Sequence, residues 1–415
     1  MGNTPNIRFK GFTDDWEQRK LSEFGEATGG TSIESEFSAD GIYKVISIGS
    51  YSEDNIYRDQ GIRAVRSDKT INRILNKGDI TMILNDKTAS GNIIGRVLLI
   101  EESGVYVYNQ RTERIEVGSE NYNSQFIYTM LNAPEIRDKI IKQSQGNTQI
   151  YVNWTTVSQT DYLVPQIEEQ IKIGEYFKSI DNLITLHQRK CDETKELKKF
   201  MLQKMFPKNG EKKPEIRFEG FTDDWEQRKL GEIANKVTTK NKDTQYVETF
   251  TNSAELGIIS QRDFFDHDVS NMDNISGYYV VDDDAFVYNP RISTSAPVGP
   301  INRNKLGRTG VMSPLYTVFK THSVYSEYLE WFFKSTRWHS FMKFNGDSGA
   351  RSDRFSIKDA VFFEMPIPIP DIEEQKKIGQ YLSTLDNLIT LHQRKCDEIK
   401  EIKKFMLQNM FPQKG

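Results

Sequence analysis

Two histidine–cysteine pairs are the first residues in this 415-residue chain whose types and spacing suggest chemistry. His187 precedes Cys191, and His392 precedes Cys396, at a spacing that places both side chains on one face of a helix. Imidazole and thiolate groups bind zinc, so a shared metal site is one interpretation. The five histidines show no metal-ligand spacing otherwise. We favour the simpler interpretation that the two pairs form a polar patch in a helix interface.

Nucleotide and methyl-transfer chemistry is a second candidate that the motifs argue against. The chain has no G-x-x-x-x-G-K-[ST] phosphate loop. The stretch VYNPRIS (287–293) begins like the Asn-Pro-Pro-aromatic motif with which adenine methyltransferases grip a flipped base. Arg291 takes the place of the second proline, and the stacking ring is missing. We therefore expect no catalytic residue in this chain, and we disfavour a self-contained methyltransferase or nuclease.

An internal duplication dominates the organisation of the chain. PNIRFKGFTDDWEQRKL (5–21) returns as PEIRFEGFTDDWEQRKL (214–230), with two differences. A longer stretch (165–210) returns at 370–415, and it includes DNLITLHQRKCDE without change. One duplication of about 205 residues is unlike a solenoid, whose repeats are short and numerous. The chain is therefore expected to hold two equivalent units, which pack most naturally about a two-fold axis.

The long repeated stretches have the pattern of helices. Apolar residues recur at alternating spacings of four and three, which is a heptad seam, and prolines flank each stretch. About 38 residues make a rod of roughly 55–60 Å. Such a helix needs a partner for its apolar stripe, and two-fold packing of the copies makes the pair antiparallel. The seam residues are Ile173, Phe177, Ile180, Ile184 and His187, and Ile378, Leu382, Leu385, Ile389 and His392.

The stretches between the repeats differ from each other and read as compact α+β domains. Short β-rich runs such as YKVISIG (43–49) and LYTVFK (315–320) alternate with glycine and asparagine turns. Helical patterns appear at 124–132 and 326–344. Residues 22–163 hold 14 Lys and Arg against 19 Asp and Glu, and residues 231–368 hold 15 against 17. Neither domain is basic overall, so any nucleic-acid surface must be one-sided.

The overall composition is that of a soluble globular protein, with 37% hydrophobic and 27% charged residues and a net charge of −4. No apolar run is long enough for a membrane helix, and we expect no membrane partner. The N-terminal residues lack the apolar core of a signal peptide. Two cysteines cannot build a disulfide framework. These features predict a cytoplasmic location.

Together, these segments resemble the specificity subunit of bacterial type I restriction–modification enzymes. The resemblance rests on GFTDDWEQRKL before each variable domain and on [VI]P-x-IEEQ-x-KIG at 164–174 and 369–379. GIISQRDFF (257–265), FVYNP (286–290) and MSPLYTVFK (312–320) are also similar to that family's domains. The resemblance covers essentially the whole chain.

The resemblance implies an α+β fold with two target-recognition domains, related by a pseudo-two-fold axis and joined by two long antiparallel coiled-coil helices. We divide the chain into a first recognition domain with its entry segment (1–163), a spacer helix (164–206), a linker (207–213), a second recognition domain (214–368) and a C-terminal spacer helix (369–415). Each domain would read one half of a bipartite, asymmetric site in double-stranded DNA, and the helices would set the distance between the halves.

The resemblance also implies partners. Two modification subunits would dock on the chain, carry S-adenosylmethionine and methylate adenine. Restriction subunits, which are motor-nucleases using ATP and Mg²⁺, would complete the complex. This chain would hold no cofactor and no metal, and it would perform no chemistry itself.

For a DNA-reading protein, the base contacts are expected from loop residues. Arg, Asn and Gln make the hydrogen bonds that distinguish base edges, and the loops at 143–154 and 345–355 occupy matching places before the two long helices. We expect contacts from Gln145, Asn147 and Gln149 and from Arg351 and Arg354, and next from Asn109, Gln110, Arg111, Asn289 and Arg291. An alternative is an antiparallel coiled-coil scaffold that binds proteins without DNA specificity.

Overall fold

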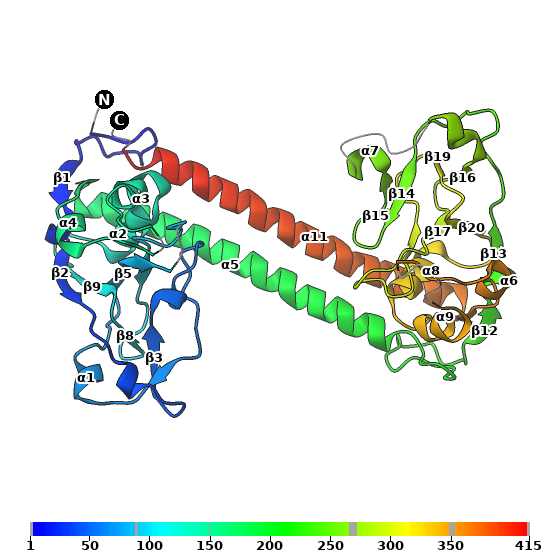
Figure 1. Ribbon diagram of the computed structural model, residues 1–415, viewed down its shortest axis with the longest axis horizontal. Helices are drawn as coiled ribbons and strands as arrows, with labels where there is room; N and C mark the ends of the chain where they lie inside the picture. The colour runs from blue at the N-terminus through cyan, green and yellow to red at the C-terminus, as the bar shows by residue number, and fades with distance from the viewer. Residues whose placement is uncertain (1–2, 88–89, 148, 265–271, 348–352, 413–415) are drawn as a thin grey trace. The chain divides into compact units, whose positions relative to one another are not determined.

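The computed structural model describes residues 3–87, 90–147, 149–264, 272–347 and 353–412. The chain divides into two compact units. Unit 1 comprises residues 1–188 and 394–415, and unit 2 comprises residues 189–393. Helices α5 (Ile167–Lys204) and α11 (Ile372–Asn409), drawn green and red in Figure 1, are therefore each divided between the units. No helix among the described residues is long and apolar enough to cross a bilayer.

Within each unit, part of α5 packs antiparallel to part of α11, as predicted. In unit 1, Lys403 Nζ lies 2.6 Å from Asp181 Oδ1, and Cys396 Sγ lies 3.7 Å from Gln188 Oε1. Residue numbers thus rise along α5 while they fall along α11. Unit 2 repeats both contacts with the roles exchanged, through the pairs Lys198–Asp386 and Cys191–Gln393.

The duplicated entry segments form strands that pair with the end of their own domain, which the sequence analysis did not predict. Strand β1 (Glu17–Lys20) pairs antiparallel with β11 (Asp161–Val164). Strand β12 (Glu226–Lys229) pairs in the same way with β21 (Pro366–Ile369). The first strand of each domain is thus hydrogen-bonded to the last strand before the long helix, which closes the domain at its base.

A buried ion pair joins each entry segment to the start of its long helix. Arg8 donates from Nε and Nη2 to the two carboxylate oxygens of Glu169, at 2.7 Å each. Arg217 and Glu374 repeat this bidentate geometry at 2.7 Å. The Glu169 and Glu374 side chains are 1% and 0% exposed, so each buried carboxylate depends on its arginine.

The glutamine and glycine of the KIG-containing motif also have structural roles. Gln170 donates to Pro165 O at 2.9 Å and accepts from the backbone N–H of Asn123 at 3.0 Å. Gln375 ties Pro370 to Tyr325 in the same way. A Cβ on Gly174 would lie 2.8 Å from Asn123 Oδ1, so glycine lets the helix approach the domain. The repeated motif therefore serves to attach each long helix to its domain.

Unit 1 is built on a four-stranded antiparallel sheet in the order β2-β9-β5-β7, beside a three-stranded sheet β4-β3-β8 (Figure 1). Helix α2 packs on β7, and its predicted bounds, 124–132, are confirmed. The elements are β2 Gly25–Gly29, β3 Tyr43–Ile46, β4 Arg63–Ala64, α1 Asp68–Ile71, β5 Ile80–Ile83, β6 Asn85–Asp86, β7 Val97–Leu99, β8 Tyr106–Tyr108, β9 Thr112–Val117, α2 Ser124–Asn132, α3 Pro134–Ile141, β10 Ile150–Tyr151 and α4 Trp154–Val157, with short 3-10 turns at Leu21–Glu23, Glu34–Glu36 and Ile48–Ser50.

Unit 2 repeats the four-stranded sheet in the order β13-β20-β17-β18, while its other strands pair differently, as β14-β15 and β16-β19. The helix predicted over 326–344 is two helices, because the backbone at Ser335 is extended and its hydroxyl donates to Phe332 O. The elements are α6 Leu230–Ile233, β13 Ala234–Lys236, β14 Phe250–Ser253, β15 Gly257–Ser260, α7 Gln261–Phe264, a 3-10 turn Met272–Gly277, β16 Tyr279–Val281, β17 Phe286–Tyr288, β18 Ile301–Arg303, β19 Gly310–Met312, β20 Thr317–Thr321, α8 Ser326–Lys334, α9 His339–Asn345 and α10 Asp359–Phe362.

The main core of each unit lies between the four-stranded sheet and the long helices. In unit 1, the rings of Phe177 and Phe411 stack with their centroids 6.1 Å apart. The domain-proximal seam residues are buried in these cores, and those nearer mid-helix are half-buried. The buried set is Ile173, Phe177 and Ile180 in unit 1 and Ile378, Leu382 and Leu385 in unit 2, and the half-buried set is Ile184, His187, Ile389 and His392.

Candidate nucleic-acid interface

In unit 2, the structure brings two of the predicted arginines together. Arg291 follows strand β17, and Arg354 lies in the segment before the long helix α11, yet their backbones form an antiparallel bridge. Phe355 N donates to Pro290 O at 2.7 Å, and Ile292 N donates to Asp353 O at 3.0 Å. Two cations are thereby presented from adjacent segments. Arg351, the other arginine predicted in this loop, lies outside the described residues.

Asn289 shapes this turn. Its Nδ2 donates to Asn252 O at 2.8 Å, and its Oδ1 accepts from Arg291 N at 3.0 Å. Asn252 is itself held by Val287 O and by the Nδ2 of Asn302. Because both ends of the Asn289 amide are engaged, this side chain positions Arg291 in the free protein.

Unit 1 uses an equivalent pair of segments with different side chains. Gln145 and Tyr151 exchange two backbone hydrogen bonds of 2.9 and 3.0 Å, which closes a hairpin whose exposed tip contains Asn147 and Gln149. The hairpin strand β10 pairs with β6, directly after β5. The predicted residues Gln145, Asn147 and Gln149 thus lie on one exposed hairpin.

Strand β6 supplies residues that the sequence analysis missed. MILND (82–86) in unit 1 occupies the place of FVYNP (286–290) in unit 2. Met82 and Phe286 both lie in the main core of their unit. The next residues, Ile83 and Val287, both lie in the second, smaller core on the other face of the sheet. Asn85 therefore corresponds to Asn289, and the exposed Lys87 corresponds to Arg291. The similarity of the two asparagine-containing strand ends was the signal that could have identified them.

The three remaining predicted residues follow strand β8. Asn109 is 7% exposed, and its Oδ1 accepts from Ile33 N at 3.1 Å. Gln110 is exposed and donates from Nε2 to Glu34 Oε1 at 3.2 Å. Arg111 has a positive φ of 68°, and its carbonyl accepts from Leu84 N at 3.0 Å. Arg111 therefore lies beside β6 and its hairpin, whereas Asn109 is a buried bridge between loops.

An arginine also holds the loop that follows β6. Arg137 on α3 donates to Ile94 O at 3.0 Å and to Gly91 O at 3.1 Å. Burial lowers the pKa of Arg137 to about 10, and the charge of Arg96 contributes to the decrease. At neutral pH, Arg137 keeps its charge and anchors this loop through carbonyl groups.

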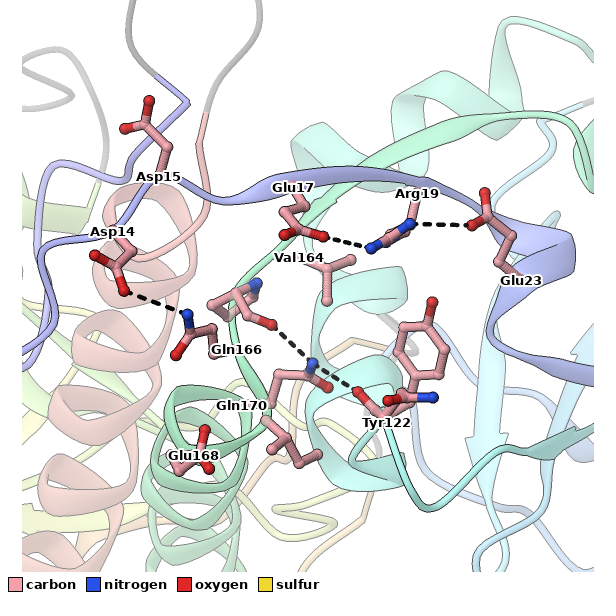
Figure 2. A pocket seen from close by; sticks show the side chains of 13 residues that line it. Asp14, Asp15, Glu17, Arg19, Glu23, Tyr122, Val164, Gln166, Glu168 and Gln170 are labelled. Atoms are coloured by element: carbon pink, nitrogen blue, oxygen red, sulfur yellow. Dashed lines mark hydrogen bonds and ion pairs between the residues drawn. The ribbon is translucent and has the colours of Figure 1, made fainter.

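A hollow of about 660 Å³ at the base of unit 1, beside β1 and β11, is acidic, unlike the loops around β6 (Figure 2). It is lined by the carboxylates of Asp14, Asp15, Glu17, Glu23 and Glu168, and Arg19 is the one basic side chain among its lining residues. Gln166 Nε2 donates to Asp14 Oδ2 at 3.3 Å across its edge. Such a hollow repels phosphate. The base of unit 1 is therefore unsuited to nucleic acid, unlike the loops around β6.

In the described part of the chain, no three His, Cys, Asp or Glu side chains gather as a metal site. Cys191 and Cys396 are free and buried in their helix pairs. The arrangement of exposed Arg, Lys, Asn and Gln on paired loops suits phosphate and base-edge contacts.

Comparisons with known proteins show which chains this one resembles. A type I restriction enzyme MjaVIII specificity subunit from Methanocaldococcus jannaschii is 22% identical over 417 aligned residues, which cover 94% of this chain and 91% of the relative. A putative type I restriction enzyme MjaX specificity subunit from the same organism is 27% identical, over 62% of this chain and 59% of the relative. The crystal structure of the type I restriction–modification S subunit from M. genitalium has the same fold, with a TM-score of 0.62, 13% identity and coverage of 99% of this chain and 100% of that one.

The sequence pattern of one family matches most of the chain in two copies. The family is described as the type I restriction modification DNA specificity domain, and it matches residues 13–196 and 222–401. Each match contains one four-stranded sheet, its paired loops and most of one long helix. The chain therefore belongs to the type I restriction–modification DNA specificity family.

Proposed function

We propose that the protein is the DNA-recognition subunit of a type I restriction–modification complex and binds an asymmetric bipartite site in double-stranded DNA. The observation that carries this proposal is a pair of neighbouring segments that occurs in both units. One segment follows the equivalent sheet strand (β5 or β17), and the other lies before the long helix. In unit 1 this pair presents Asn85, Lys87 and the hairpin glutamines, and in unit 2 it presents Arg291 and Arg354. Equivalent loops with different side chains suit two half-sites of different sequence.

The proposal includes two modification subunits that dock on the chain and methylate adenine. Its support is a set of exposed apolar helix residues that the duplication repeats. Unit 1 exposes Leu183 of α5 and Ile402 and Phe405 of α11. Unit 2 exposes their counterparts Leu388, Leu197 and Phe200. Equal apolar surfaces on the two units suit two copies of one partner.

In this scheme the reactive groups belong to the partners. S-adenosylmethionine would be held by the modification subunits, and ATP and Mg²⁺ by the restriction subunits. This chain would supply affinity through cations and specificity through base contacts.

The decisive experiment is to replace the variable segment 231–368 by a second copy of 22–163, co-express the chain with modification subunits and map the methylated adenines. We expect an inverted repeat of the unit 1 half-site around an unread spacer of fixed length, because equivalent domains on a two-fold frame read the two strands in the same way. An unchanged methylation pattern, or one unrelated to the parental half-sites, would overturn the proposal.

A point variant sharpens this test. Arg354→Ala should reduce binding to the mapped site relative to random duplex by roughly 10-fold or more, since one base contact contributes about 1–3 kcal/mol. Lys343→Ala, an exposed cation on α9 in the same unit, serves as the control. Equal effects of the two substitutions on specific and random DNA would exclude Arg354 as a specificity residue.

A further inference from the structure

A cavity of about 450 Å³ in unit 2 lies beside the bridged arginine loops. Tyr279 of β16, Tyr316 before β20 and Pro290 after β17 contribute apolar walls, and Arg354 lies on its lining. Its size falls within the range of sites that hold small molecules. The cavity is therefore next to the segment through which unit 2 is proposed to contact DNA.

The tyrosines are held in place and half-buried. Tyr316 Oη lies 3.4 Å from Thr251 Oγ1, and Tyr279 is fixed by the pairing of its strand with Met312. A third ring, Tyr288, is stacked on Phe362 at 5.0 Å and forms part of the floor. The half-buried rings of Tyr279 on β16 and Tyr316 before β20 provide flat apolar surfaces on which an aromatic ligand can stack.

Polar groups among the lining residues can form directional hydrogen bonds. Thr317 Oγ1 donates to Asp359 Oδ1 at 3.3 Å, and Lys236 forms an ion pair with the same carboxylate. The hydrogen bond to Asp359 raises the pKa of Lys236, so Lys236 is charged at neutral pH. Its positive charge offsets the carboxylate, which reduces the repulsion of a nearby DNA phosphate.

From this combination we infer that the cavity receives one extrahelical nucleobase from the half-site read by unit 2. The ring would stack against Tyr279 and Tyr316, its edge would meet Thr317 and Asp359, and Arg354 would lie beside it on the lining of the cavity. The inference rests on the proposed DNA-recognition function and adds a pocket for a base outside the stack.

Energy considerations favour extrusion only in the presence of other DNA contacts. Removing a base from the stack costs a few kcal/mol, and stacking on an aromatic side chain returns about 1–3 kcal/mol per base. The terms nearly balance, so a pair that is already broken should bind more tightly than an intact one.

Unit 1 provides an internal control because it lacks these rings. Leu84 corresponds to Tyr288 at the end of the strand. The loop before β9 is Asn109–Gln110–Arg111, where unit 2 has Ser313, Pro314, Leu315 and Tyr316 before β20. Extrusion of a base into this chain is therefore expected only in the half-site that unit 2 reads.

The test uses the full chain assembled with modification subunits and a set of duplexes that carry the mapped site with one mismatch each. Outside the adenines that the modification subunits methylate, we expect one position in the unit 2 half-site at which a mismatch tightens binding by about 10-fold, because the cost of breaking that pair is already met. Mismatches at the other positions outside the methylated adenines, including those of the unit 1 half-site, should weaken binding or leave it unchanged. Permanganate oxidation of an unpaired thymine, placed at the same position, identifies the extruded base.

Variants of the tyrosines connect this signal to the cavity. Tyr316→Ala and Tyr279→Ala should abolish the tightening, while Tyr316→Phe, which keeps the ring, should preserve it. No tightening position outside the methylated adenines, or a tightening there that persists in Tyr316→Ala, would overturn the inference. So would a loss of assembly with the modification subunits in Tyr316→Ala without any change in the mismatch profile, since that result assigns the cavity to a protein segment. Absence of any site-specific DNA binding would instead refute the proposed function.

Discussion

The two units share one structural frame, made of the entry strand, the closing strand and the long helices, and they differ in the strands and loops that this frame supports. Both contain the bidentate Arg–Glu ion pair, the strand pairing that closes the domain, and the Lys–Asp contact between helices. They differ in the outer strands, in the loops around β6 and β17, and in the polarity of the sheet interior. The duplicated residues thus maintain the frame, while the divergent residues determine what each domain can contact.

The interior of the central sheet shows this divergence most clearly. Thr81, Thr112 and Glu113 in unit 1 correspond to Ala285, Val318 and Phe319 in unit 2, according to the registers of β5 with β9 and β17 with β20. The hydroxyls of Thr81, Thr112 and Tyr51 are buried together and form no well-aligned hydrogen bond among the described residues. Unit 1 therefore has a more polar interior and is expected to be the less stable unit.

The largest expected effect tests the shared frame. Arg8→Ala and Arg217→Ala each leave a buried carboxylate uncompensated, and each should destabilise its unit by about 3–5 kcal/mol in urea unfolding. Arg8→Ala should have the larger effect, because Trp225 Nε1 still donates to Glu374 at 3.1 Å, whereas Trp16 Nε1 has no partner among the described residues.

The paired control removes both charges. Arg8→Met combined with Glu169→Leu should recover most of the loss, since no charge remains buried. If Arg8→Ala and Arg217→Ala cost less than about 1 kcal/mol, the ion pairs do not hold the frame.

The next effect tests the polar interior of unit 1. Glu113 is 6% exposed, and burial raises its pKa to about 7, although Arg73 opposes the shift. The folded chain therefore keeps this proton to a higher pH than the unfolded chain, and stability falls as pH rises from about 4.5 to 7. Glu113→Gln should stabilise the protein by about 2 kcal/mol at pH 8 and little at pH 4.5. Thermal unfolding at both pH values measures this, and an equal shift at both would contradict it.

A smaller effect distinguishes the two sheet interiors. Thr112→Val removes a buried hydroxyl that forms no well-aligned hydrogen bond and should stabilise unit 1 by up to about 1 kcal/mol. Val318→Thr introduces such a hydroxyl in unit 2 and should destabilise it by about 1–2 kcal/mol. Chemical unfolding of both variants checks the prediction, which fails if the two substitutions change stability in the same direction.

The smallest effect compares the interhelical ion pairs. Lys403–Asp181 and Lys198–Asp386 are partly exposed, so each should contribute less than about 1 kcal/mol. Lys198 also lies 5.3 Å from the centroid of Trp331, and cation–π contact adds a few tenths of a kcal/mol or more. Lys198→Ala should therefore cost slightly more than Lys403→Ala. Unfolding of both variants at low and high salt measures this. If Lys198→Ala and Lys403→Ala lose the same stability, and salt does not change that loss, neither the ion pairs nor the cation–π contact contributes.

The long helices and the duplicated frame could be predicted because their signals are local or repeated. A heptad seam such as Ile173, Phe177 and Ile180 reports burial directly through its spacing. The bounds of α2 were likewise evident from a short apolar pattern. The break at Ser335 was missed because a hydroxyl-to-carbonyl bond ends the helix where the apolar pattern continues.

The candidate interface was only partly predictable. Gln145, Asn147 and Gln149 share one hairpin because they are close in sequence. The neighbours of Arg291 and Arg111 come from distant segments, and no local pattern indicates that β10 returns to β6 or that Arg354 bridges to Arg291. Asn109 shows the opposite case, since its residue type suits base reading but its buried amide holds Ile33.

The sequence by itself determined the duplication, the two long helices, their antiparallel pairing and the family, because these follow from repeated letters and from a periodicity that a helix imposes on its own chain. The tertiary structure decided which segments close each domain, which loops meet, and where a cavity forms between strands. Those features depend on strand register and on contacts between residues far apart in the chain. Sequence spacing does not encode such contacts, and they arise only when the core is packed.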